Sequence, residues 1–268
     1  MTRAPAARAV LVSALSVTAL LTATACSAED GAAARSAASA PASTPASAAS
    51  PAAEQPSPTG SAESSVLSAE QVRAALVTET DLGEPWIPTR GAATWRDGLL
   101  KATAQDADCR RLLDALYTED LFGDPTGPHA AVTLDDAYSD AQLRYQVAAH
   151  PSAEVDRTLA WLASLPGTCE RFTATTTGAG RQEARVAELP LPEVGDARAA
   201  LRITLSGRTP DGADSHLTVD LAAVRVGEET ITLTNGGLGE VVPEVTQAVA
   251  QFGTERLTEI RRQSRLRV

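Results

Sequence analysis

The chain has 268 residues, a formal net charge of -11 and an aromatic content of 3%. This negative charge opposes binding to nucleic acid, so we expect no nucleic-acid partner. The first 65 residues are too biased in composition to join a hydrophobic core. About 200 residues remain, which is enough for one well-buried domain.

Residues 1–25 have the features of a secretory signal peptide. Two arginines, Arg3 and Arg8, precede the apolar stretch 9–21, which is too short to span a bilayer comfortably. The sequence therefore predicts that this segment directs the chain to export and does not form part of the fold.

A lone cysteine, Cys26, follows the signal peptide directly. The small residues ATA at 23–25 suit cleavage by a signal peptidase. The arrangement resembles the bacterial lipobox, in which the cysteine thiol receives a diacylglycerol and becomes the first residue of the mature protein; alanine replaces the usual leucine three places before it. We expect Cys26 to anchor the protein to the extracellular face of the cell membrane. Plain secretion and an incidental cysteine are the alternatives.

Residues 26–65 consist almost entirely of Ala, Ser, Pro, Thr and Gly with a few acids. Such a composition cannot bury enough apolar surface to offset the entropy of ordering. We expect a disordered tether with polyproline stretches, which holds a folded domain over 66–263 away from the membrane or threads it into the cell wall. Residues 264–268 form a basic tail.

Three helices are predicted in the first half of the domain. A capping box at Ser68 begins a helix over 69–77. The apolar spacing predicts two further helices, over 108–117 and 152–165, and Pro166 is expected to end the second of these.

The apolar period changes to two in 143–148 and again in 199–234. Short turns at 210–212 and 227–229 divide the longer segment, which predicts a three-stranded antiparallel meander. The apolar alternation shifts phase at 222–223, which indicates a bulge. Weaker strands are predicted at 130–134, 170–177 and 183–188.

The predicted fold class is α+β, with an antiparallel sheet packed on one face by a few helices and exposed to solvent on the other face.

A final helix over 242–263 carries apolar residues on one side, and five arginines occur in the last thirteen residues. Cations near a helix C-terminus favour the helix dipole. Contact with anionic lipid is the alternative reading of these arginines.

Cys109 and Cys169 are the pair of cysteines left once Cys26 is lipidated. Export places the chain in an oxidising compartment, so we expect a disulfide between them. A nucleophilic cysteine is the alternative, but no cysteine–histidine signature surrounds either residue.

The histidines His129, His150 and His216 stand far apart in the sequence and lack the spacing of a zinc site. We expect them in loops or on the surface, with no metal and no cofactor. The chain also lacks the G-x-S-x-G signature of common serine hydrolases.

Two groups of aspartates could carry chemistry: Asp135, Asp136 and Asp140 in one segment, and Asp211 and Asp214 in another. A pair of carboxylates at a suitable separation can hydrolyse glycosidic bonds. Aspartate is also ordinary in turns, which is the reading that we favour. The sequence does not decide whether these residues form a functional site.

The segment TLTNGGLGE at 232–240 places glycines between a strand and a helix, as phosphate-binding loops do. It lacks the Walker lysine and follows an antiparallel strand, so we expect a flexible turn from strand to helix.

The tryptophans Trp86, Trp95 and Trp161 are expected in the core or lining a groove.

Three motifs together resemble the extracellular sensor domains related to that of the mycobacterial receptor kinase PknH, which also occur as free-standing actinobacterial lipoproteins. They are the helical segment LSAEQVRAALVTETDLG, the pair Trp161 and Cys169 with seven residues between them, and the hairpin VRVGEETITLT. The resemblance covers roughly 66–263. It implies an antiparallel sheet with helices around a cleft that binds an unidentified ligand, and it implies no catalytic residue.

The leading hypothesis is a lipid-anchored cell-surface protein with a non-enzymatic domain that binds a small molecule, a lipid or another component of the cell envelope. A second hypothesis is a carrier of lipid or other apolar cargo, because a sheet with one solvent-exposed face and helices on the other can enclose an apolar cavity. A third is a divergent cell-wall hydrolase with convergent carboxylates of perturbed pKa.

Overall fold

A computed structural model describes residues 66–266 of the chain. The predicted signal peptide, the tether, Cys26 and the last two residues of the basic tail lie outside the described residues. The described helices are α1 (Ala69–Ala74), α2 (Glu79–Leu82), the π-helical turn η1 (Arg96–Leu100), α3 (Ala107–Thr118), α4 (Ser152–Thr168) and α5 (Pro243–Leu266). The described strands are β1 (Trp86–Pro88), β2 (Ala102–Thr103), β3 (His129–Asp136), β4 (Gln142–Ala149), β5 (Phe172–Thr176), β6 (Gly180–Glu188), β7 (Ala197–Arg208), β8 (Asp214–Val226) and β9 (Glu229–Leu238).

These nine strands form one antiparallel sheet in the order β1-β3-β4-β9-β8-β7-β6-β5-β2. The long strands β7, β8 and β9 are consecutive neighbours, which confirms the meander predicted at 199–234. The short strands β1 and β2 lie at the two edges. Short edge strands offer few unpaired backbone groups to other chains.

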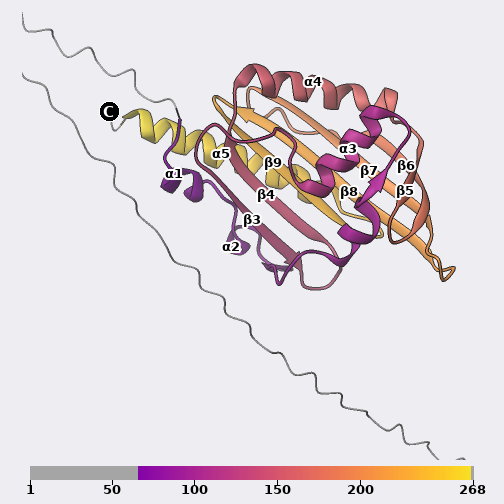
Figure 1. Cartoon of the computed structure of the whole chain (residues 1–268). Helices are drawn as coiled ribbons and strands as arrows, with labels where there is room; N and C mark the ends of the chain where they lie inside the picture. The colour runs from indigo at the N-terminus through magenta and orange to yellow at the C-terminus, as the bar shows by residue number, and fades with distance from the viewer. Residues whose placement is uncertain (1–65, 267–268) are drawn as a thin grey trace, which may run out of the picture. The chain divides into compact units, whose positions relative to one another are not determined.

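Helices pack on both faces of the sheet. On one face, α3 and α4 contact an apolar cluster that includes Leu205 of β7 and Leu217 of β8. On the opposite face, α1 and α5 contact a second cluster that includes Tyr145 of β4 and Leu233 of β9. Figure 1 shows α3 in front of the sheet and α5 behind it. The predicted α+β class with an antiparallel sheet is confirmed, whereas the expectation of helices on a single face is corrected.

Strand β8 explains the shift of apolar phase at 222–223. Its pairing with β7 and β9 continues without interruption through this point, so the predicted bulge is wrong. Leu217 and Leu221 face α3 and α4, whereas Ala222 and Val224 face α1 and α5. The apolar side chains change face because the covering helices change face, and the backbone stays regular.

The observed helix ends differ from the predicted ends for local reasons. Helix α1 stops at Ala74 because Thr78 begins a new capped turn, with reciprocal hydrogen bonds between Thr78 and Asp81. Helix α4 continues past Pro166 to Thr168, where the backbone N–H of Cys169 donates to the Leu165 carbonyl at 2.7 Å. Helix α5 extends to Leu266, three residues beyond the predicted end.

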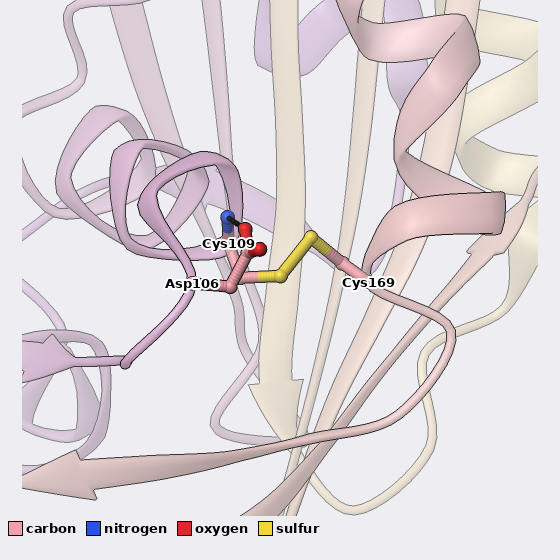
Figure 2. Close-up of side chains that lie close together, drawn as sticks. All are labelled: Asp106, Cys109 and Cys169. Carbon is pink, nitrogen blue, oxygen red and sulfur yellow. Dashed lines mark hydrogen bonds between the residues drawn. A yellow bond between two sulfur atoms is a disulfide. The ribbon is translucent and has the colours of Figure 1, made fainter.

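The predicted disulfide joins Cys109 of α3 to Cys169 at the end of α4, so it links the two helices on one face of the sheet (Figure 2). On the other face, two ion pairs hold α5. Arg256 contacts Asp81 at 2.6 Å, and Arg261 pairs with the fully buried Glu229. Within residues 66–266, no helix is long and apolar enough to cross a bilayer.

Candidate functional site

One half of the sheet has a polar face that neither α4 nor α5 covers. On β4, Leu143, Tyr145 and Val147 point toward α5, so the residues between them point to the face of α3. Those residues include Arg144 and Gln146, which are half-buried. Across the β4–β9 pairing they lie opposite Thr234 and Thr232, which completes a polar strip of four side chains.

The strip forms one wall of a small cavity, the arginine pocket, whose other wall is the end of α3. Its apolar lining comes from Ala115, Leu116, Leu121 and Leu221, and its polar lining from Glu119, Arg144, Gln146, Thr232 and Thr234. The enclosed space is about 20 Å³, which is room for about one water molecule. The pocket is therefore small in this structure and amphipathic in its lining.

Two charged residues of the lining, Glu119 and Arg144, form a cluster with Arg96, which contacts Glu119 from outside the lining. Glu119 receives Nη1 of Arg96 and Nε of Arg144, each at 2.8 Å from a different carboxylate oxygen. Arg96 also donates through Nη2 to the carbonyls of Leu116 and Tyr117, at the end of α3. Nη2 of Arg144 donates to Gln146 at 3.0 Å. The cluster therefore fixes the end of α3 against the polar strip.

Two larger hollows adjoin at Trp95, and together we call them the Trp95 groove. One, of about 530 Å³, lies between 89–95 and the β3–β4 hairpin. The other, of about 590 Å³, lies between η1, the β5–β6 turn and the ends of β8 and β9. Thr94 and Trp95 line both hollows. Such volumes are typical of small-molecule sites.

Trp95 is fixed at the centre of this groove. Its side chain is 6% exposed, and its indole N–H donates to the backbone carbonyl of Asp140 at 2.9 Å. The prediction that the tryptophans lie in the core or line a groove agrees with this position and with the buried Trp86. Trp161 is half-buried, donates to Asp108 at 3.0 Å and stacks beneath Arg111.

The first group of candidate aspartates lines one hollow of the Trp95 groove. Asp135 accepts hydrogen bonds from the Thr89 hydroxyl, the Gln142 amide and a backbone N–H at 2.8–3.0 Å. Burial raises the pKa of its carboxyl, but these hydrogen bonds lower it further, so the pKa lies below its usual value. Asp136 accepts from the backbone of its own hairpin turn. Both carboxylates thus hold loops in place.

The second group of aspartates lies at the β7–β8 hairpin. Asp211 is exposed, and a hydrogen bond from the Thr209 side chain lowers the pKa of its carboxyl. Asp214 is also exposed and pairs with Arg208 at 3.3 Å. Asp214 lines the second hollow of the Trp95 groove and the first group lines the other hollow, whereas Asp211 lines neither.

The three histidines differ in their exposure to solvent. His129 and His216 are exposed, as predicted. His150 lies in the loop between β4 and α4, as predicted, but it is only 5% exposed and so is not a surface residue. Its ring lies between the Thr230 hydroxyl, at 3.0 Å from Nδ1, and the Gly123 carbonyl, at 3.2 Å from Nε2. Burial lowers the pKa of His150.

Within residues 66–266, one group of side chains brings three possible metal ligands together: Asp106, Cys109 and Cys169. Figure 2 shows that both sulfurs belong to the disulfide and that Asp106 points back to the start of α3. Asp106 accepts the backbone N–H groups of Asp108 and Cys109 at 2.9 and 3.1 Å. The group is a helix cap beside a disulfide.

The glycine-rich segment after β9 has a packing role. Gly236 and Gly237 belong to β9 itself, so the expectation that they form a flexible turn is corrected. A Cβ on Gly236 would lie 2.9 Å from the Trp95 ring, and one on Gly237 would lie 2.9 Å from the Ala141 backbone. Gly239, with φ +85°, makes the actual turn.

Sequence reasoning missed the charged cluster at Glu119, Arg96 and Arg144. The alternation in 143–148 indicates which β4 residues share a face, and the threonines of TITLT share the corresponding face of β9. A polar strip on this face could therefore have been predicted from the sequence. Its contact with the end of α3 was not, because that contact depends on the tertiary packing of α3.

No family model matches the chain, and no curated protein matches it. Among solved structures, a similar one is the extracellular domain of PknH from Mycobacterium tuberculosis. The sequence identity is 12% and the TM-score is 0.47. The aligned region covers 74% of this chain and 97% of that chain.

Proposed function

We propose that the domain binds a small ligand outside the cell and is not an enzyme. The observation that carries this proposal is the polar half-face of the sheet, with the arginine pocket and the Trp95 groove on it. Ligand sites combine an apolar lining with a few placed polar groups, and the arginine pocket has this composition.

The state of the candidate acids supports binding over catalysis. A general acid or base must reach its substrate with a usable proton or lone pair. Hydrogen bonds from loop groups engage the carboxylates of Asp135 and Asp136. The lowered pKa of Asp135 also opposes a role as a proton donor near neutral pH.

The disulfide supports a location outside the cytoplasm, because disulfides persist in oxidising compartments. We propose further that Cys26 carries the lipid that attaches this domain to the membrane. A Cys26→Ser protein should fold normally and appear in the culture medium, as measured by cell fractionation. Retention of that variant in the membrane fraction would disprove the anchor.

Binding is tested on the full chain, purified from the cell envelope in mild detergent and examined by native mass spectrometry. We expect a bound small molecule on the wild type and its loss in Thr234→Trp, which fills the polar strip. The matched control is Thr173→Trp, an exposed position on β5, which should keep the ligand. A wild type without ligand, or equal retention by both variants, would contradict the proposal.

A hydrolase would behave differently in the same preparation. Turnover of glycan or ester substrates by the wild type, lost in Asp135→Ala or Asp214→Ala, would replace the binding proposal with the hydrolase. The carrier of apolar cargo gains no support from the arginine pocket, since its space of about 20 Å³ with Glu119 in place cannot hold the long acyl chain of a lipid.

A further inference from the structure

We propose that the ligand of the arginine pocket carries a carboxylate and that Glu119 occupies the position of this carboxylate when the site is empty. This inference rests on the proposed function and names its ligand class. Arg96 and Arg144 each contact a different oxygen of Glu119 at 2.8 Å. The pocket therefore already holds a carboxylate, supplied by the protein itself, between two guanidinium groups.

The position of Glu119 is unfavourable in two respects. Its backbone is left-handed, with φ 59°, and it is the one non-glycine residue with positive φ in residues 66–266. Residues with a Cβ pay a free-energy cost in this conformation. Glu119 also caps the C-terminus of α3, where the helix dipole disfavours negative charge. The attraction of the two arginines offsets both costs. Glu119 is therefore held weakly on balance, and a competing carboxylate can displace it.

The arginines are held in place independently of Glu119. The side chains of Arg96 and Arg144 are 12% and 23% exposed. Arg96 donates to the carbonyls at the end of α3, and Arg144 donates to Gln146. When Glu119 moves aside, the two guanidinium groups therefore stay oriented, which lowers the cost of binding a new carboxylate.

The rest of the lining indicates the body of the ligand. Leu116 and Leu121 line the pocket from the end of α3 and the residues after it, whereas Leu221 of β8 lies beside Thr234 of β9 on the sheet. Once Glu119 has moved aside, a short apolar chain would contact these leucines, whereas an uncharged molecule would leave the two arginines without an anionic partner. The inferred class is a small organic acid with a short apolar body.

The test measures binding of hexanoate and of 1-hexanol to the full chain by NMR titration. Glu119→Gly removes the competing carboxylate and suits the left-handed backbone. We expect hexanoate to bind this variant at least about tenfold more tightly than the wild type. This gain corresponds to the free energy of one charge-assisted hydrogen bond. Adding Arg144→Gln to Glu119→Gly should abolish the gain, and 1-hexanol should bind neither protein.

The matched control is Glu154→Gln, which removes one negative charge from an exposed residue of α4 and should bind hexanoate as the wild type does. Equal binding of hexanoate and 1-hexanol, or no gain in Glu119→Gly over the control, overturns the inference. A neutral small molecule found on the wild type and displaced by Thr234→Trp would leave the proposed function intact while overturning the carboxylate. Absence of any ligand on the wild type contradicts the proposed function instead.

Discussion

The indole ring of Trp95 packs directly on the backbone of Gly236 in β9. A Cβ built on Gly236 would lie 2.9 Å from Cη2 of Trp95 and 3.1 Å from the Val219 side chain. Residues of the segment 90–99 line both hollows of the Trp95 groove, and this contact places the segment against β9. The width of the groove therefore depends on the absence of a side chain at position 236.

Gly236→Ala should destabilise the fold by about 1–3 kcal/mol, because a methyl group forced into a packed contact displaces its neighbours. Urea unfolding followed by circular dichroism measures this change. Gly98→Ala in η1 is the matched control, since a Cβ there has nothing within 4 Å. Equal stability of the two variants would show that Trp95 does not rest on Gly236.

Removal of the disulfide should cost much of the stability of the domain. The bond closes a loop with a sequence separation of 60 residues, for which the chain-entropy relation predicts about 4 kcal/mol. The double variant Cys109→Ala, Cys169→Ala should therefore unfold at a lower urea concentration than the oxidised wild type. The wild type treated with a reductant should shift to a similar extent, whereas an unchanged midpoint in both would contradict the prediction.

His150 should make the stability depend on pH. Burial lowers the pKa of its imidazole in the folded state, while in the unfolded state the pKa is about 6.5. The unfolded state then binds more protons, so the free energy of unfolding falls as pH falls below about 6.5 toward the folded-state pKa. Above pH 7 the imidazole is neutral in both states, and its contribution no longer changes with pH.

Urea unfolding at pH 7 and pH 5 measures this dependence. His150→Gln, which can still donate to the Gly123 carbonyl, should lose less stability than the wild type between these two values. His216→Gln is the control at an exposed position and should follow the wild-type profile. A wild-type stability that is constant over this interval would contradict the assignment of a neutral, buried His150.

Breaking the buried ion pair of Glu229 and Arg261 should be among the costliest single changes. Glu229 is 0% exposed, and its other carboxylate oxygen accepts the backbone N–H of Leu67 at 3.0 Å. Glu229→Gln leaves the buried guanidinium without a counter-ion, which typically costs about 3–5 kcal/mol. The measurement is again the free energy of unfolding in urea.

Two further variants separate charge from packing. Replacing both partners by methionine should recover most of the loss, because an apolar pair leaves no buried charge unpaired. Glu259→Gln, which breaks the exposed pair with Arg262 on the same helix, should change little. If Glu229→Gln and Glu259→Gln had equal effects, the buried pair would not stabilise α5.

Much of the fold could be predicted from local patterns. The capping box at Ser68, the apolar period of α3 and the turns that bound β8 depend on neighbouring residues, so the sequence contains them. The disulfide was also predictable, because the predicted export and the predicted lipidation of Cys26 leave Cys109 one partner. The anchor at Cys26 remains a prediction from the residues that surround it.

The candidate site could not be predicted in the same way. Arg96, Glu119 and Arg144 come from η1, the end of α3 and β4, and they meet only because α3 packs across the sheet. The buried pair of Glu229 and Arg261 could not be predicted from the sequence for the same reason. The sequence by itself determined helices α1, α3, α4 and α5, the meander and the disulfide, because these follow from periodicity, turn chemistry and cysteine number. Only the tertiary structure decided which face of the sheet each helix covers and which charges meet, because both depend on contacts between distant segments.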